Sequence, residues 1–295
     1  MKIMLINPPI REWSKPNVPP LGLGYLAAVL RQHHHEVELL DLNARRWPEA
    51  EVEARLKGSD ADLFGIGALV TLYGYVKPLV RRLKAWHPDQ PVVVGNSVAS
   101  SIPQLFMERA PADAVVIGEA EESLPELVDA FAGRRDFSTV AGIGYRDRAG
   151  KVHFTAHRAP PADLDQLPYP AWDLLPMEEV YFRSYSGPLN QNKWQGGEND
   201  LTVREISHVS SRGCPYPCIY CYHDRRWRGR SAASLVEEVR FLKQKFKIDS
   251  LQFLDECFVI DRNRVLEFCR LMREAKTGVR WGVNGRLNCV DEEML

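Results

Sequence analysis

The chain has 295 residues, of which 45% are hydrophobic and 26% are charged, and its formal net charge is −1. The length exceeds that of one average domain, so we expect two domains. The near-neutral charge excludes the electrostatic signature of a nucleic-acid or anionic-membrane partner. All six cysteines lie in the last third of a chain that is not short. We therefore expect metal-binding or redox cysteines in a reducing, cytoplasmic compartment rather than a disulfide framework.

Residues 1–135 alternate strand-like and helix-like segments with regular spacing. Apolar runs such as PVVVG and AVVIG are typical of buried parallel strands. Five βα units in a row predict a parallel sheet with helices on both faces, which is a flavodoxin-like (Rossmann-like) α/β domain. The predicted strands are 2–7, 36–42, 63–69, 91–95 and 114–118, and the predicted helices are 21–32, 48–57, 73–86, 102–109 and 123–131.

Residues 136–200 differ from this pattern. Segment 143–155 is typical of a β-hairpin with its turn at Ala149-Gly150. The proline-rich segment 163–176 cannot form a regular helix or strand throughout, and 189–200 is polar and loop-like. We interpret 136–200 as a hairpin and linker between two domains.

Residues 201–295 return to the βα pattern. Strand-like segments at 206–210, 250–254 and 279–283 alternate with helical segments at 231–245 and 262–275. This order predicts the first half of a partial (β/α) barrel. The pattern stops where a further helix should begin, so we expect the chain to be a truncated piece of a longer protein.

The motif CPYPCIYC places Cys214, Cys218 and Cys221 on one loop between a strand and a helix. Three thiolates at this CxxxCxxC spacing suit three corners of a 4Fe–4S cluster, which leaves the fourth iron open to another ligand. Structural zinc is an alternative, with His208 or His223 as a fourth ligand, although zinc sites usually use CxxC pairs. A disulfide and coincidental core cysteines are two further interpretations. The remaining cysteines are expected to be buried free thiols: Cys257, Cys269 and Cys289.

This cysteine loop, with SSRG directly before its first cysteine, closely resembles the cluster loop of radical S-adenosylmethionine (SAM) enzymes. The resemblance implies that Tyr220 lies against the adenine of SAM. The LDECF segment at 254–258 falls where the family has its methionine-binding motif, and it resembles the Asp-rich variant rather than Gly-Gly-Glu. Asp255 and Glu256 are thereby implied at the SAM amino group, with an ordinary acid pair at a strand end as the alternative.

Three arginines are candidates for binding or neutralising negative charge at this site. Gly285-Arg286 resembles a Gly-Arg pair that the cobalamin-linked branch of this family often has at this position. The resemblance implies a role for Arg286 at the SAM carboxylate, and a surface or salt-bridged arginine is the alternative. Arg228 and Arg230 follow the loop and could neutralise cluster or SAM charge. A solvated segment leading into the next helix is the alternative for both.

An α/β domain, a proline-rich linker and a cysteine loop, in this order, are similar to the cobalamin-binding branch of the radical SAM family. Ligands of such sheets bind at the carboxyl ends of the strands, where small residues let them approach the backbone. Ordinary βα turns are the alternative. The resemblance implies cobalamin contacts at Pro9, Leu21, Gly22, Val70, Thr71, Gly95, Ser97, Gly118 and Glu119.

The sequence lacks the DxHxxG motif whose histidine binds cobalt in many cobalamin proteins. His33, His34 and His35 end the first predicted helix, away from the strand carboxyl ends, and we interpret them as a solvated helix end. In this branch, cobalt usually lacks a protein histidine. The loop at 69–73 is therefore expected to face the lower side of the corrin.

The resemblance implies an enzyme whose cofactors are a 4Fe–4S cluster, SAM and cobalamin. We predict a class B methyltransferase-like reaction, in which a 5′-deoxyadenosyl radical activates an unactivated carbon that receives the methyl group of methylcobalamin. A cyclase or ring-rearranging enzyme with the same cofactors, and a non-catalytic cofactor-binding fragment, are the alternatives. Expected partners are a small-molecule or peptide substrate and an electron donor such as flavodoxin or ferredoxin. We expect no nucleic-acid or membrane partner, because the apolar stretch at 21–30 is too short to span a bilayer.

Overall fold

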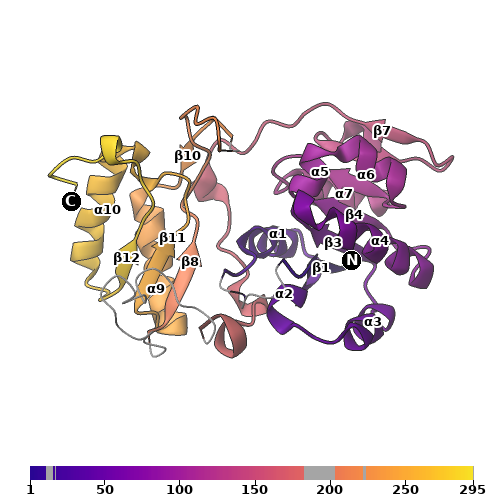
Figure 1. The fold of residues 1–295 in the computed structure, drawn as a ribbon, viewed down its shortest axis with the longest axis horizontal. Helices are drawn as coiled ribbons and strands as arrows, with labels where there is room; N and C mark the ends of the chain where they lie inside the picture. Colours follow the sequence, from indigo (N-terminus) through magenta and orange to yellow (C-terminus); the bar gives the residue numbers. More distant parts are fainter. Residues whose placement is uncertain (11–15, 17, 183–202, 222–223, 295) are drawn as a thin grey trace. The chain divides into compact units, whose positions relative to one another are not determined.

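The structure is a computed structural model that describes residues 1–10, 16, 18–182, 203–221 and 224–294 (Figure 1). The chain divides into two compact units. Both contain a sheet dominated by parallel strands with helices in the connections, so the predicted α/β fold class is confirmed. Unit 1 comprises Met1–Lys15, Gly22–Pro161 and Pro168–Pro176, and unit 2 comprises Pro16–Leu21, Ala162–Leu167 and Met177–Leu295.

Unit 1 is built on a seven-stranded sheet with the order β2-β1-β3-β4-β5-β6-β7. The first five strands pair in parallel, and their order 2-1-3-4-5 is that of flavodoxin-like folds. Their apolar runs suit strands that are buried on both faces. The parallel strands are β1 (Lys2–Asn7), β2 (Glu36–Asp41), β3 (Leu63–Gly67), β4 (Val92–Gly95) and β5 (Ala114–Val116).

Helices lie on both faces of this sheet (Figure 1). Successive strand side chains point to opposite faces, so Phe64 and Ile66 pack with Val76 of α4 in one core, whereas Gly67 approaches Leu23 of α1 on the other face. The helix predicted at 102–109 is preceded by a separate short helix. The helices are α1 (Leu21–Gln32), α2 (Leu42–Arg45), α3 (Glu49–Lys57), α4 (Tyr73–Trp86), α5 (Ser97–Ser101), α6 (Pro103–Arg109) and α7 (Ser123–Phe131), with a 3₁₀ turn η1 (Val70–Leu72) before α4.

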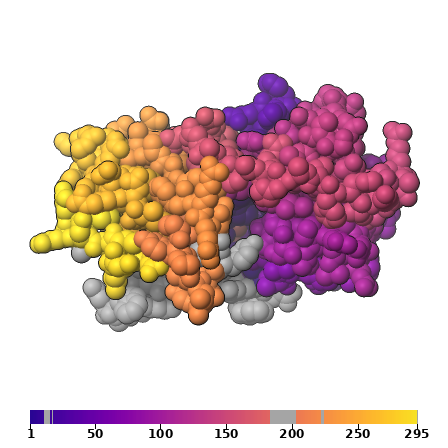
Figure 2. All heavy atoms as spheres, turned by 90° about the horizontal axis from the view of Figure 1, so that it is seen from above, coloured from indigo at the N-terminus to yellow at the C-terminus, as the bar shows by residue number. Residues whose placement is uncertain are grey.

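The hairpin predicted in the linker segment belongs to the sheet of unit 1. Strand β6 (Ile143–Arg146) pairs antiparallel with β5, and β7 (Val152–Phe154) pairs antiparallel with β6. The turn is exposed at 148–151, where Gly150 has a φ of 84°, and it is rose-coloured in Figure 2. Unpaired hydrogen-bonding groups at the edge of β5 explain why the hairpin adds to this sheet.

The proline-rich segment 163–176 forms no regular helix or strand throughout, as predicted, and contains 3₁₀ turns at Leu164–Gln166 and Trp172–Leu174. Two further short turns lie outside it, a 3₁₀ turn at Phe137–Thr139 and a π turn at Met177–Tyr181. The loop predicted at 189–200 lies outside the described residues. Among the helices that the structure describes, none combines the length and apolar character that a membrane span requires.

Unit 2 contains a three-stranded parallel sheet ordered β12-β11-β8, with α9 in the connection from β8 to β11 and α10 in the connection from β11 to β12. Phe253 packs against Phe268 of α10, with ring centroids 5.7 Å apart. On the opposite face, the Ser250 hydroxyl donates to the Glu205 carboxylate over 2.6 Å. One face is thus a hydrophobic core and the other is polar. The elements are β8 (Glu205–His208), β9 (Ser211–Arg212), β10 (Arg228–Gly229), α9 (Ala232–Phe246), β11 (Ser250–Phe253), η7 (Phe258–Ile260), α10 (Arg262–Ala275), β12 (Arg280–Gly282) and η8 (Leu287–Cys289).

Candidate functional site

The three predicted cluster cysteines lie in unit 2 on residues 213–227, which we call the cluster loop. The loop connects β9 to β10, and the antiparallel pairing of these short strands closes its base. Gly213 has a φ of 81°, and a Cβ atom there would overlap the carbonyl oxygen of Arg226. The Cys214 N–H donates to the Asp224 carbonyl over 2.7 Å. Only glycine can therefore begin this loop without displacing its returning strand.

The thiols of this loop become more exposed along the chain. Cys214 is buried, Cys218 is partly buried and Cys221 is exposed. The Cys221 N–H donates to the Cys218 carbonyl over 3.1 Å, which places the last two cysteines on one turn. No three His, Cys, Asp or Glu side chains of the described residues converge on a single-ion site. The expectation of a cluster therefore rests on the CxxxCxxC spacing of the three cysteines.

The zinc alternative finds no support at His208. This side chain is only 2% exposed, and its Nε2 atom lies 3.2 Å from the carboxylate of Glu238 on α9. His208 therefore lies in a buried polar cluster with Glu238. The second proposed zinc ligand, His223, lies outside the described residues.

Asp255 lies under the start of the cluster loop. Its side chain is 1% exposed and accepts hydrogen bonds from the backbone N–H and the hydroxyl of both Ser210 and Ser211. Arg264 of α10 donates to the Ser210 hydroxyl over 2.6 Å and to the Arg230 carbonyl over 2.7 Å. Burial raises the pKa of Asp255, while bonds from the serines and the charge of Arg264 oppose that rise. Asp255 thus holds the backbone that leads into the loop.

The two acidic residues of the LDECF segment therefore differ. Asp255 is enclosed by backbone and hydroxyl donors, whereas Glu256 is exposed. An exposed carboxylate directly after β11 is accessible to a ligand at the strand carboxyl ends. Sequence reasoning treated the pair alike, because burial at adjacent positions of a turn depends on tertiary contacts.

Arg286 reaches the cluster loop from the segment after β12. Its Nη1 atom lies 3.5 Å from Cys218 Sγ, and its guanidinium carbon lies 4.0 Å from the centre of the Tyr216 ring. The Tyr216 hydroxyl lies 2.7 Å from Cys289 Sγ, and this hydrogen bond raises the pKa of Tyr216. Sequence reasoning missed Tyr216 and Cys289, although the aromatic residue inside the cysteine motif was a visible signal.

The remaining predicted residues around the loop have contrasting environments. Tyr220 is 89% exposed, so its ring is available to a ligand. Arg228 and Arg230 are 6% and 3% exposed, so the alternative of a solvated segment is wrong for both. Arg230 forms a buried ion pair with Glu238. The charge of Arg230 is therefore balanced inside unit 2.

In unit 1, three predicted cobalamin-binding residues lie at the carboxyl ends of β3, β4 and β5. The Val70 N–H donates to the Ser97 hydroxyl over 2.8 Å, which joins the loops after β3 and β4. The Gly118 N–H donates to the Ser100 hydroxyl over 2.9 Å, which joins the loops after β4 and β5. Ser100 was missed by sequence reasoning, because its role depends on the neighbouring loop. These bonds hold the strand ends as one edge, which we call the carboxyl edge.

The carboxyl edge leaves room for a ligand. A Cβ atom at Gly95 or Gly118 would meet no heavy atom within 4 Å. Leu69 and Val70 are 39% and 37% exposed, so the loop after β3 presents apolar surface. Space above glycines beside exposed apolar side chains suits a broad, largely apolar ring system such as a corrin.

The remaining residues implied for cobalamin vary in accessibility. Gly22 and Thr71 are exposed, Pro9 and Glu119 are partly buried, and Leu21 is buried. Their contacts with a ligand stay a prediction.

The three histidines lie where the sequence places them, at the opposite edge of the sheet. His33 and His34 are exposed, as expected for a solvated helix end. His35 is 8% exposed, and its Nδ1 atom lies 3.5 Å from the N-terminal amine, so the solvated interpretation is wrong for this residue. Burial and the nearby amine lower the pKa of His35.

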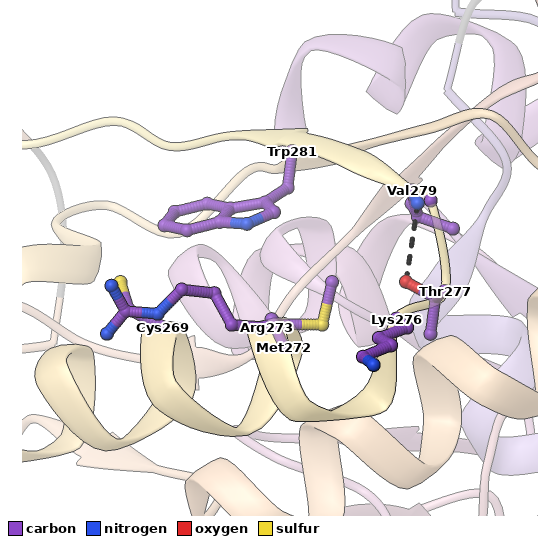
Figure 3. Close-up of a pocket in the computed structure, with 8 residues that line it drawn as sticks. Cys269, Met272, Arg273, Lys276, Thr277, Val279 and Trp281 are labelled. Atoms are coloured by element: carbon purple, nitrogen blue, oxygen red, sulfur yellow. Dashed lines mark hydrogen bonds between the residues drawn. The ribbon is translucent and has the colours of Figure 1, made fainter.

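A pocket of about 410 Å³ in unit 2 lies apart from the predicted site residues. It is open between the carboxyl end of α10 and strand β12, with Trp281 above Arg273 and Met272 (Figure 3). None of the residues that line it was predicted to bind a cofactor. Its lining residues are Cys269, Met272, Arg273, Lys276, Thr277, Gly278, Val279 and Trp281.

The chain is therefore a two-unit α/β protein. Unit 1 is flavodoxin-like with an open carboxyl edge, and unit 2 is a parallel βα unit with a three-cysteine loop. Residues 10–128 match the B12 binding domain family. An uncharacterized methyltransferase of Pyrococcus horikoshii is 29% identical over the whole chain, which covers 62% of that protein. An anaerobic magnesium-protoporphyrin IX monomethyl ester cyclase of Rubrivivax gelatinosus is 27% identical over the whole chain, which covers 52% of it.

Solved structures agree with this fold. One is the cobalamin-dependent S-adenosylmethionine radical enzyme OxsB with aqua-cobalamin and SAM bound. The match covers 92% of this chain and 37% of the OxsB chain, with a TM-score of 0.71 and 21% identity. The radical SAM methyltransferase TsrM from Kitasatospora setae, with cobalamin and a 4Fe–4S cluster bound, matches 99% of the chain and 57% of its own, with a TM-score of 0.70 and 20% identity. The chain is similar to these proteins over nearly its whole length, and it spans about half to two thirds of the length of the curated relatives named above.

Proposed function

We propose that this chain binds cobalamin on the carboxyl edge of unit 1 and a 4Fe–4S cluster with SAM on unit 2, and that it serves methyl transfer to an unactivated carbon. The observation that carries the proposal is the three-cysteine loop, which starts at Gly213 and is held from below by Asp255. It occurs in a chain whose N-terminal region matches a B12 binding domain and whose relatives include methyltransferases.

Unit 2 supplies the ligands and the SAM contacts in this proposal. Bound together, the reduced cluster and SAM supply a 5′-deoxyadenosyl radical, and methylcobalamin supplies the methyl group. Cys214, Cys218 and Cys221 hold the cluster. The exposed Tyr220 ring stacks on the adenine of SAM, and the exposed Glu256 carboxylate accepts from its amino group.

Unit 1 supplies a surface rather than a cobalt ligand. Gly95 and Gly118 would leave space for the corrin, and the exposed Leu69 and Val70 would supply apolar contacts to it. His33 and its neighbours lie at the opposite edge of the sheet, so they supply no cobalt ligand at the carboxyl edge. A small-molecule or peptide substrate and an external electron donor complete the proposal.

Anaerobic reconstitution tests the cofactors. The chain is incubated with iron, sulfide and hydroxocobalamin, and absorption and electron paramagnetic resonance (EPR) spectra are recorded. We expect one 4Fe–4S cluster and one cobalamin per chain. Cys218→Ser should abolish the cluster, whereas Cys269→Ser, which changes a partly buried cysteine of α10, should retain it. A wild-type chain that assembles no cluster under these conditions would refute the proposal.

Methyl transfer is tested with SAM carrying a labelled methyl group and candidate substrates of the named relatives. Label in a product together with 5′-deoxyadenosine supports the methyltransferase. A cyclase is the second candidate, because one of the relatives at 27% identity is a cyclase. It would form 5′-deoxyadenosine and a changed but unlabelled product. Cofactor binding without either product would support a non-catalytic fragment.

A further inference from the structure

We propose that Arg286 raises the reduction potential of the cluster by donating to the thiolate of Cys218, with the Tyr216 ring as its platform. The inference rests on the proposed cluster site. Arg286 Nη1 lies 3.5 Å from Cys218 Sγ, and the guanidinium lies 4.0 Å above the Tyr216 ring centre. The ring and the thiol belong to the same turn, because Tyr216 and Cys218 are two residues apart.

The guanidinium is held in this place by several contacts of one short segment. Its Nε atom donates to the Asn288 side-chain oxygen over 3.2 Å. Cys289, which ends the same segment, contacts the Tyr216 hydroxyl through its Sγ atom at 2.7 Å. The segment therefore contacts both the face and the hydroxyl of the Tyr216 ring. A planar cation stacked on an aromatic face is well oriented for a directed hydrogen bond.

Two different roles for Arg286 account for less of this geometry. The first is a salt-bridged arginine, but no ion pair within the described part of the chain involves Arg286. The second is a contact with the SAM carboxylate, which would not require a donor aimed at Cys218 Sγ. The contact between Arg286 and the proposed cluster ligand Cys218 is present in the structure.

The expected effect follows from charge. Reduction adds one electron to the cluster from an external donor and breaks no bond, so the reduced state is more negative by one charge. Hydrogen bonds to the ligating sulfurs and nearby positive charge stabilise that state and raise the reduction potential. Removing the guanidinium should therefore make the cluster harder to reduce.

The test is a redox titration of the reconstituted 295-residue chain without SAM, with dithionite as reductant and EPR detection. We expect a midpoint potential in Arg286→Gln that is clearly more negative than in the wild type. Arg286→Lys keeps the charge but loses the planar stack, so its potential should lie between the two. Arg270→Gln removes one exposed arginine of α10 that pairs with Glu274, and it should titrate like the wild type.

An unchanged potential in Arg286→Gln would overturn the inference. Weaker SAM binding in the same variant would then assign the guanidinium to SAM. If Arg286→Gln retains no cluster, Tyr216→Leu is compared with Tyr216→Phe, which keeps the ring. A more negative potential in the leucine variant alone supports the inference, and equal potentials contradict it. Failure of the wild type to assemble a cluster would instead refute the proposed function, and this inference with it.

Discussion

The carboxyl edge of unit 1 and the cluster loop of unit 2 are built by different interactions. At the edge, backbone N–H groups donate to the hydroxyls of Ser97 and Ser100, and glycines leave open space. At the loop, buried charged side chains such as Asp255 and Arg264 hold the backbone. A broad ligand needs room and a stable platform, whereas three thiolates that share one cluster need a loop held in one conformation. The two sites should therefore fail in different ways.

The largest effect is expected for Asp255→Ala. This substitution leaves the N–H and hydroxyl groups of Ser210 and Ser211 without their buried acceptor, and it removes the largest of the negative charges that act on Arg264. We expect a loss of roughly 3–5 kcal/mol in the free energy of unfolding, because one side of a buried charge network is removed. Urea unfolding and the iron content after reconstitution measure both consequences.

Glu256→Ala is the matched control for that substitution. Its exposed carboxylate should contribute little to stability, so its unfolding midpoint should equal that of the wild type. If Asp255→Ala also unfolded like the wild type, Asp255 would not support the loop, and a direct role at SAM would be the better explanation.

Gly213→Ala should have the next largest effect. The substituted residue would keep a positive φ and its Cβ atom would overlap the Arg226 carbonyl, so we expect a loss of roughly 1–3 kcal/mol and less cluster per chain. Gly278→Ala is the control, because Gly278 has a φ of 68° but open space around its Cβ position. Differential scanning fluorimetry compares the two. Equal losses would mean that backbone strain alone, without the close approach, determines the result.

At the carboxyl edge, the expected defect is in binding rather than in folding. A Cβ atom at position 95 would meet no heavy atom within 4 Å, so Gly95→Val should change stability by no more than about 0.5 kcal/mol. It would occupy space proposed for the corrin, and we expect the cobalamin Kd to rise about tenfold or more, which equals about 1.4 kcal/mol.

Fluorescence quenching by hydroxocobalamin measures that Kd. Asp89→Val, which changes an exposed residue before β4 at the opposite edge of the sheet, should bind like the wild type. Unchanged affinity in Gly95→Val would move the proposed cobalamin site away from β4.

The smallest effect concerns pH. Burial raises the pKa of Asp255 in the folded chain above its unfolded value, so the folded state binds the proton more tightly. Proton binding by Asp255 therefore stabilises the folded state. This stabilisation is complete below the pKa of Asp255 in the unfolded chain, and it is lost as the pH rises through the pKa of Asp255 in the folded chain. Asp255→Asn lacks this titration. The wild type should therefore lose unfolding free energy relative to Asp255→Asn as the pH rises above the ordinary carboxyl range, as urea titrations at several pH values can show. If the difference in unfolding free energy between the wild type and Asp255→Asn stays constant with pH, this prediction is wrong.

Local patterns in the sequence were sufficient to locate most of both units. Apolar strand runs and helical spacing predicted the five parallel strands of unit 1, and the spacing of Cys214, Cys218 and Cys221 located the loop. Such signals can be read from the chain because periodicity and spacing are properties of neighbouring residues. The pairing of β6 with β5 could not be read this way, because a hairpin joins whichever free strand edge the fold presents to it.

Only the tertiary structure separated residues that look alike in sequence. It buried Asp255 beneath Ser210 and left the next residue, Glu256, exposed. It also brought Arg286 to Cys218, which is 68 residues earlier in the chain. The physical reason is that burial and hydrogen bonding depend on which distant segments pack together, whereas the sequence reports only the chemistry of each side chain.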